Sequence, residues 1–292
     1  MLDLDRNRTA APPRDAATLI LVRDGSGALE VFCVKRSAQS AFMGGAIVFP
    51  GGKVDETDRG SEWLSLITEA PPRIDELADS LEVAIAAAIA ACREALEEAL
   101  VLPTTKECNG NELRELSIRI RKNPIELRSW LAERKDRLSL SSMIPFARWL
   151  TPTAESRRFD TRFFMLRAHA DWNASHDAHE TVDSFWATPR SILDRFIRKE
   201  IQLLPPTHRT IEWLSAHSKV DDAIAGALQN DLRVICPELI PQQDASGETL
   251  ALTLPGDPEH TEREARVPGQ SRFVLRSEQW LPESAPAHRP SR

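Results

Sequence analysis

The sequence predicts an α/β domain with helical insertions, and three observations support this fold class. Short β-type runs alternate with helical segments between residues 17 and 218. One segment, 81–100, contains neither Gly nor Pro and is rich in Ala, Leu and Glu, which is typical of a long helix. The chain has 292 residues, 41% of them hydrophobic, enough to bury a sizeable core. This order of elements favours a mixed sheet covered by helices.

The first half of the chain contains the clearest elements. The runs "TLILVRD" and "LEVFCVKRS" flank a Gly-Ser-Gly turn and predict a β-hairpin. A third run, "GGAIVFPGG", ends at Gly51 and Gly52, which permit backbone conformations that a side chain forbids. Residues 53–80 are polar, contain two prolines and are interpreted as an insertion. The segment 81–100 then predicts a helix of about five turns.

The second half predicts further helices and strands. Residues 111–140 carry two amphipathic patterns and are interpreted as a helical insertion. Strands are expected at 147–152, 159–168 and 183–188, helices at 189–200 and 205–218, and short β-like pieces at 248–255 and 271–280. We therefore expect an N-terminal tail over residues 1–16, a domain over residues 17–235 and a Pro-rich C-terminal extension over residues 236–292.

Charge and cysteine content exclude several classes of function. The chain has 37 basic and 44 acidic residues, a net charge of −7, which repels a nucleic-acid backbone. Its four cysteines are scattered without a CxxC pair, which indicates reduced thiols and no cysteine zinc site. No apolar window has the length of a membrane span. We expect a cytoplasmic protein that binds neither nucleic acid nor membrane; the sequence leaves homodimerisation open.

Three carboxylates gather at the end of the long predicted helix. Glu94, Glu97 and Glu98 are three or four residues apart and share one helix face. Such a face is usually solvated, but the preceding "AIAAAIAAC" is apolar enough to predict a buried element. Buried like charges need a cation, and oxygen ligands without His or Cys suit Mg²⁺ or Mn²⁺. The adjacent Arg93 is expected to fix the orientation of a glutamate by an ion pair.

These residues resemble a known motif. "FPGG" at 49–52 followed by "REALEE" at 93–98 resembles the Nudix box of the Nudix hydrolases, in which a glycine loop leads to a helix with Arg-Glu and Glu-Glu pairs. The resemblance implies a Nudix α/β/α sandwich with a mixed sheet. It also implies that Glu97 and Glu98 bind the metal, and that Glu94 is a third ligand or accepts a proton from the attacking water.

The sequence departs from the usual box at three places. About forty residues separate the glycines from the glutamate pairs, where the family has a short spacer. The glutamate normally found in that spacer has Glu56 and Asp58 as its nearest candidates. Leu100 stands where the family usually has glycine.

A second motif narrows the resemblance to one branch. "KRSAQSAFMGGAIVFPGG" at 35–52 is similar to the signature that coenzyme A hydrolases of this family carry before the box, although Ser40, Ala41 and Gly44 differ from it. The resemblance implies hydrolysis of coenzyme A or acyl-CoA to 3′,5′-ADP and the 4′-phosphopantetheine portion. Lys35, Arg36, Gly51 and Gly52 would then contact the substrate or complete the metal site.

Other hypotheses remain open at this point. The same chemistry would suit NADH, ADP-ribose or a nucleotide sugar, and Leu100 with the unusual spacer also permits a Nudix-fold binding or regulatory protein with impaired catalysis. Glu180 is a candidate late metal ligand, against the alternative of an ordinary loop carboxylate. Arg158 or its neighbour Arg157 is a candidate for the 3′-phosphate, against a simple salt bridge. The histidines at 169, 176 and 179 lack a metal-site spacing and are interpreted as solvated.

Overall fold

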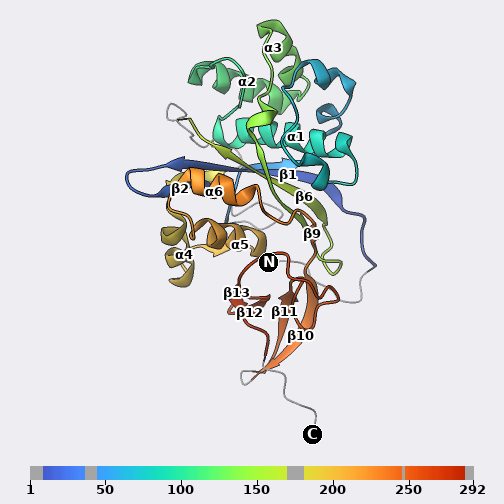
Figure 1. The fold of residues 1–292 in the computed structure, drawn as a ribbon, viewed down its shortest axis with the longest axis vertical. Coiled ribbons are helices and arrows are strands. Elements are labelled where there is room, and N and C mark those ends of the chain that lie inside the picture. The colour runs from blue at the N-terminus through green and yellow to red at the C-terminus, as the bar shows by residue number, and fades with distance from the viewer. Residues whose placement is uncertain (1–8, 37–44, 170–180, 245–246, 287–292) are drawn as a thin grey trace.

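The computed structural model describes residues 9–36, 45–169, 181–244 and 247–286. In this part of the chain a nine-stranded mixed sheet lies between two layers of helices, and a four-stranded antiparallel sheet follows near the C-terminus (Figure 1). The predicted α/β/α sandwich with a mixed sheet is therefore confirmed. No described helix is long and apolar enough to cross a membrane.

The large sheet takes its strands from most of the chain. They are β1 (Arg14–Asp24), β2 (Leu29–Arg36), β3 (Ala46–Val48), β4 (Gly51–Lys53), β5 (Ile144–Leu150), β6 (Phe159–Arg167), β7 (Thr181–Ala187), β8 (Gln202–Leu203) and β9 (Val234–Ile235). The strand order is β8-β3-β2-β1-β6-β5-β9, with β4 paired to β1 and β7 paired to β2. β1 and β2 form the predicted antiparallel hairpin, and β1 runs parallel to β6 at the centre.

Helices cover both faces of this sheet (Figure 1). On one face lie α1 (Leu81–Ala99), α2 (Gly110–Lys122) and α3 (Glu126–Arg134), and on the other α4 (Pro189–Ile197), α5 (Pro205–Leu214) and α6 (Val220–Ala227). Short 3-10 helices occupy Glu56–Asp58, Ser61–Ser65, Ile74–Glu76 and Leu140–Ser142. Ser80 caps the start of α1: its hydroxyl accepts a hydrogen bond from the Val83 amide and so satisfies one free donor of the first turn. The helix ends at Leu100 in the left-handed conformation, with φ of 54°.

Strand alternation divides the core between the two faces. Ala17, Leu19 and Leu21 of β1 pack in the cluster that contains the buried alanines of α1. Ile20 and Val22, one residue out of phase, pack in the cluster on the α4, α5 and α6 side. The Ala-rich sequence of α1 follows from this burial, because small side chains let the helix lie close to the central strands.

The C-terminal extension forms the second sheet. Its strands are β10 (Glu238–Asp244), β11 (Gly247–Thr253), β12 (Arg272–Arg276) and β13 (Gln279–Glu283). Leu252, Phe273 and Trp280 of this sheet belong to the same hydrophobic cluster as α4, α5 and the lower face of the large sheet. The extension is therefore packed on the domain through a continuous core.

Candidate active site

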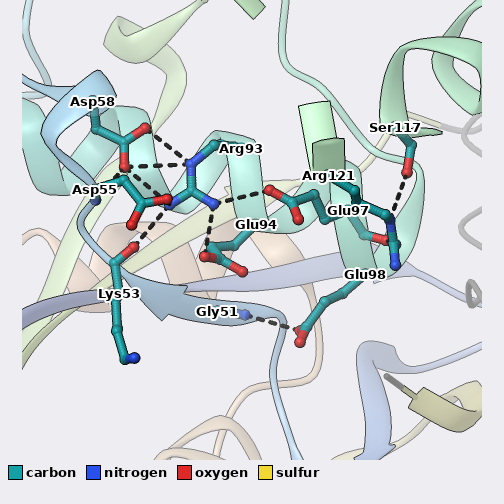
Figure 2. Close-up of polar contacts among 10 residues, drawn as sticks. All are labelled: Gly51, Lys53, Asp55, Asp58, Arg93, Glu94, Glu97, Glu98, Ser117 and Arg121. Atoms are coloured by element: carbon teal, nitrogen blue, oxygen red, sulfur yellow. Dashed lines mark hydrogen bonds and ion pairs between the residues drawn. The ribbon is translucent and has the colours of Figure 1, made fainter. Parts of the chain in front are cut away.

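Arg93 of α1 is the centre of a buried polar network (Figure 2). Its Nε lies 3.0 Å from Oδ1 of Asp58 and its Nη2 lies 2.9 Å from Oδ2, so the guanidinium and the carboxylate meet at two points. Both side chains are almost fully buried, and Nη2 also donates to the Lys53 carbonyl at 2.8 Å. Of the two spacer candidates, Asp58 meets Arg93, whereas the side chain of Glu56 is 96% exposed.

The remaining nitrogen of Arg93 contacts two glutamates. Nη1 lies 2.8 Å from Oε1 of Glu94 and 2.9 Å from Oε1 of Glu97. Glu98 points instead toward β4, where its Oε2 accepts a hydrogen bond from the Gly51 amide at 3.1 Å (Figure 2). One guanidinium thus holds two of the three carboxylates, and the strand backbone holds the third.

The two glycines of β4 allow two close approaches, Gly52 to the Glu94 side chain of α1 and Gly51 to the backbone of β1. A Cβ atom at Gly52 would lie 2.4 Å from Cδ of Glu94, far inside van der Waals contact. A Cβ atom at Gly51 would lie 2.5 Å from the backbone oxygen of Ala17 on β1. The space that these missing side chains leave is occupied by the Glu94 carboxylate and by the neighbouring strand.

The chemistry of these donors fits a hard divalent cation. Burial raises the pKa of Glu94 to about 7; the Arg93 charge opposes this rise, and the nearby Glu97 carboxylate adds to it. A cation beside crowded carboxylates favours their ionised forms. Arg93 brings one positive charge to three carboxylates, Asp58, Glu94 and Glu97, so negative charge remains that a cation can neutralise. The described residues contain no group of three His, Cys, Asp or Glu side chains already gathered as a metal site.

Arg121 of α2 reaches the same region and was not singled out from the sequence. Its Nη2 donates to the backbone carbonyl of Glu97, near the end of α1, and its Nε lies 3.5 Å from the Ser117 hydroxyl (Figure 2). A basic residue in the last turn of an amphipathic helix is common, so the pattern gave no signal of this contact.

A cavity of about 1360 Å³ contains the network. Glu94, Glu97, Glu98, Gly51 and Gly52 all line it. Such a volume exceeds the range of about 300–1,000 Å³ that is usual for pockets holding drug-sized ligands. An extended substrate therefore has room beside the carboxylates.

The predicted cationic residues have different surroundings. Arg36 lines the cavity, and its Nε is buried without a hydrogen-bond partner among the described residues. Lys35 is exposed and is not among the residues that line the cavity. Arg158 is buried and donates to the carbonyls of Thr151 and Ala11 at 3.0 and 2.9 Å, whereas Arg157 is exposed at the cavity.

The remaining candidates lie near residues that the structure leaves undescribed. Glu180 and the histidines at 176 and 179 fall outside the described residues, so the late metal ligand stays a prediction. His169 is described and exposed.

Known proteins resemble this chain in sequence and in fold. A family model described as the NUDT19 Nudix domain matches residues 72–214. A crystal structure of a NUDIX hydrolase from Alicyclobacillus acidocaldarius superposes with a TM-score of 0.63 at 25% identity, covering 74% of this chain and 96% of that one. The chain belongs to the Nudix hydrolase family. Residues 53–80 separate the glycines of its box from the helix that carries Arg93, and Asp58 is one of them.

Curated Nudix relatives cover most of the chain. The acyl-coenzyme A diphosphatase NUDT19 of Xenopus laevis is 26% identical, with 86% of this chain and 76% of the relative aligned. The protein of the same name from Gallus gallus is also 26% identical, with 84% of this chain and 79% of the relative aligned. The similarity therefore extends beyond the residues matched by the family model.

Proposed function

We propose that this Nudix hydrolase cleaves the diphosphate linkage of coenzyme A or an acyl-CoA, with Mg²⁺ or Mn²⁺ as cofactor. The observation that carries the proposal is the placement of Glu94, Glu97 and Glu98 on one wall of a cavity large enough for an extended nucleotide derivative. The acyl-CoA diphosphatases that resemble it over most of its length support the choice of substrate. The products would be 3′,5′-ADP and the (acyl-)4′-phosphopantetheine.

The three glutamates and Arg93 would have different roles in the reaction. Glu97 and Glu98, with Glu94 or a glycine carbonyl of β4, would hold the divalent ion, which supplies positive charge to neutralise the diphosphate. Water attacks one phosphorus, the bridging P–O bond breaks, and the other phosphate leaves. Glu94, whose carboxylate lies beside Glu97 on the wall of the cavity, would accept the proton that this water releases. Arg93 keeps Glu94 and Glu97 in place.

Arg36 is the cavity cation best suited to contact the substrate. Arg36 is partly buried and lines the cavity, and arginine binds phosphate oxygens in a forked geometry. The hydrogen bonds of Arg158 to two carbonyls favour a structural role for that side chain, so we assign phosphate contact at this end of the cavity to Arg157. The cysteines are all free, in keeping with the cytoplasmic location that we propose.

Turnover of coenzyme A, an acyl-CoA, NADH and ADP-ribose with each metal tests the proposal. We expect the two coenzyme A compounds to have the highest kcat/KM, with products identified by chromatography. Equal or faster turnover of NADH or ADP-ribose would reject the substrate assignment. Glu97→Gln should abolish hydrolysis and weaken Mn²⁺ binding in a titration while the protein stays folded. Normal hydrolysis by this variant would reject the metal role of Glu97.

A further inference from the structure

The cavity continues away from the carboxylates along the sheet. Below the α1 face, β1 and β6 contribute Thr18, Thr161 and Phe163 to its lining, and β5 contributes Trp149. The register pairs Thr18 with Phe163, so these side chains lie on the same face of neighbouring strands. Phe163 and Trp149 belong to the hydrophobic cluster on the α4 and α5 side. This part of the cavity therefore has a floor of two aromatic rings and two threonines.

The opposite wall comes from two other elements. The start of α5 contributes Leu204, Pro205 and Pro206, and the C-terminal sheet contributes Leu252 of β11, with Pro237 just before β10. Leu252 is almost fully buried in the same cluster as Phe163. The C-terminal sheet is therefore part of the cavity, although it lies far from the box in sequence and outside the stretch matched by the family model.

This wall is firmly attached to the domain. Gln279 Nε2 donates to the Ile201 carbonyl at 3.3 Å, and Arg209 of α5 donates to the Gln270 carbonyl. The His208 ring lies between Phe196 of α4 and Phe273 of β12, with ring centroids 5.0 and 5.5 Å away. A wall fixed in this way can limit the size of the group that the cavity accepts.

Charge is distributed unevenly along the cavity. Its acidic lining residues are Asp55 and the three glutamates, all beside β4 and the end of α1. The described lining between the sheet and the C-terminal wall carries no acid and combines aromatic, aliphatic and proline side chains with the threonines of β1, β6 and α5; Arg157 and Arg158 lie at its edge, in the loop between β5 and β6. Moving an apolar group from water into apolar surroundings is favourable, because it lowers the free energy.

We propose that the C-terminal sheet forms the outer wall of a slot for the apolar acyl tail of the substrate, between Leu252 and Leu204 on one side and Phe163 on the other. The inference rests on the proposed function, because it places the diphosphate at the glutamates and the acyl tail in the apolar part of the same cavity. The C-terminal extension would then set the length or bulk of the acyl group that is accepted.

Filling the slot from the C-terminal wall tests this inference. Leu252→Phe should lower kcat/KM for a long-chain acyl-CoA at least about tenfold relative to free coenzyme A, since one methylene more or less in a hydrophobic pocket is worth about this factor. Leu239→Phe is the matched control: Leu239 pairs with Leu252 in the register of β10 and β11 but does not line the cavity. Its ratio of acyl-CoA to coenzyme A turnover should equal that of the wild type.

A second variant at a less buried position keeps the test valid if Leu252→Phe does not fold. Leu204 is only partly buried, and Leu204→Trp should change the same ratio in the same direction. If the wild type hydrolyses both compounds and neither variant alters their ratio, the slot is wrong and the proposed function stands. If the wild type hydrolyses neither compound, both the proposed function and the acyl slot are wrong.

Discussion

Arg93 and Asp58 meet through two contacts in the buried interior, although 35 residues separate them in the sequence. Asp58 lies in the segment 53–80 and Arg93 lies in the helix that follows it, so this pair fixes the segment to α1. Arg93 in turn holds Glu94 and Glu97, so Asp58 acts on the carboxylates through one intermediate residue.

Removing the charge of Asp58 should therefore weaken both stability and activity. Asp58→Asn leaves Arg93 buried with less compensation, and breaking such a pair costs about 3–5 kcal/mol. We expect a fall of that order in the free energy of unfolding measured with urea, together with lower kcat. Glu56→Gln, in the same turn but exposed, should stay within about 0.5 kcal/mol of the wild type. Equal stability of the two variants would show that the buried pair of Asp58 and Arg93 does not contribute this free energy of unfolding.

A side chain at Gly52 should disturb catalysis more than folding. Gly52→Ala places a methyl group where the Glu94 carboxylate now lies, so that carboxylate must move away from β4. We expect kcat to fall at least about tenfold, the loss that misplacing a catalytic group readily causes. Gly110→Ala is the control, because a Cβ atom there meets open space at the start of α2. Full activity of Gly52→Ala would mean that Glu94 need not keep its position.

Leu100 gives a prediction about strain at the end of α1. Its φ of 54° disfavours any side chain, whereas glycine adopts this conformation freely. Leu100→Gly and Leu100→Ala both lose the leucine side chain, but only the glycine variant relaxes the backbone. The glycine variant should be more stable than the alanine variant by about 1 kcal/mol in thermal or urea unfolding. The reverse order would argue against backbone strain at this position.

His208 predicts acid sensitivity. Burial lowers the pKa of His208 from 6.5 to about 4, and the Arg209 charge acts in the same direction. In the unfolded chain His208 is therefore protonated below about pH 6.5, whereas in the folded protein it is protonated only below about pH 4. Stability should fall across this window by about 3 kcal/mol from this residue. His208→Gln should flatten the dependence of unfolding free energy on pH between 6.5 and 4; parallel curves would contradict the assignment.

The sequence predicted those elements whose signals are local. The absence of Gly and Pro located α1 to within a residue at each end, and the Gly-Ser-Gly turn located the hairpin of β1 and β2. The apolar run before Cys92 also indicated that the carboxylates sit on a buried helix, and Glu98 is indeed only 7% exposed. Local periodicity and turn chemistry are sufficient for such features.

Features that depend on distant contacts could not be found in this way. Asp58 and Glu56 look equally suitable in the sequence, and only the fold brings one of them to Arg93. Residues 271–280, expected as one β-like piece, contain part of a hairpin that turns at Ser277 and Glu278, both with positive φ and neither a glycine. Arg121 reaches the site because α2 folds back on α1, a packing that helical periodicity alone does not define.

The hydrophobic cluster shared by α4, α5 and the C-terminal sheet determines how the protein unfolds. A chain cut before β10 would uncover Phe196 and His208 and lose one side of its substrate cavity at once. Melting should then be a single cooperative event, in which the extension and the catalytic half lose their structure together.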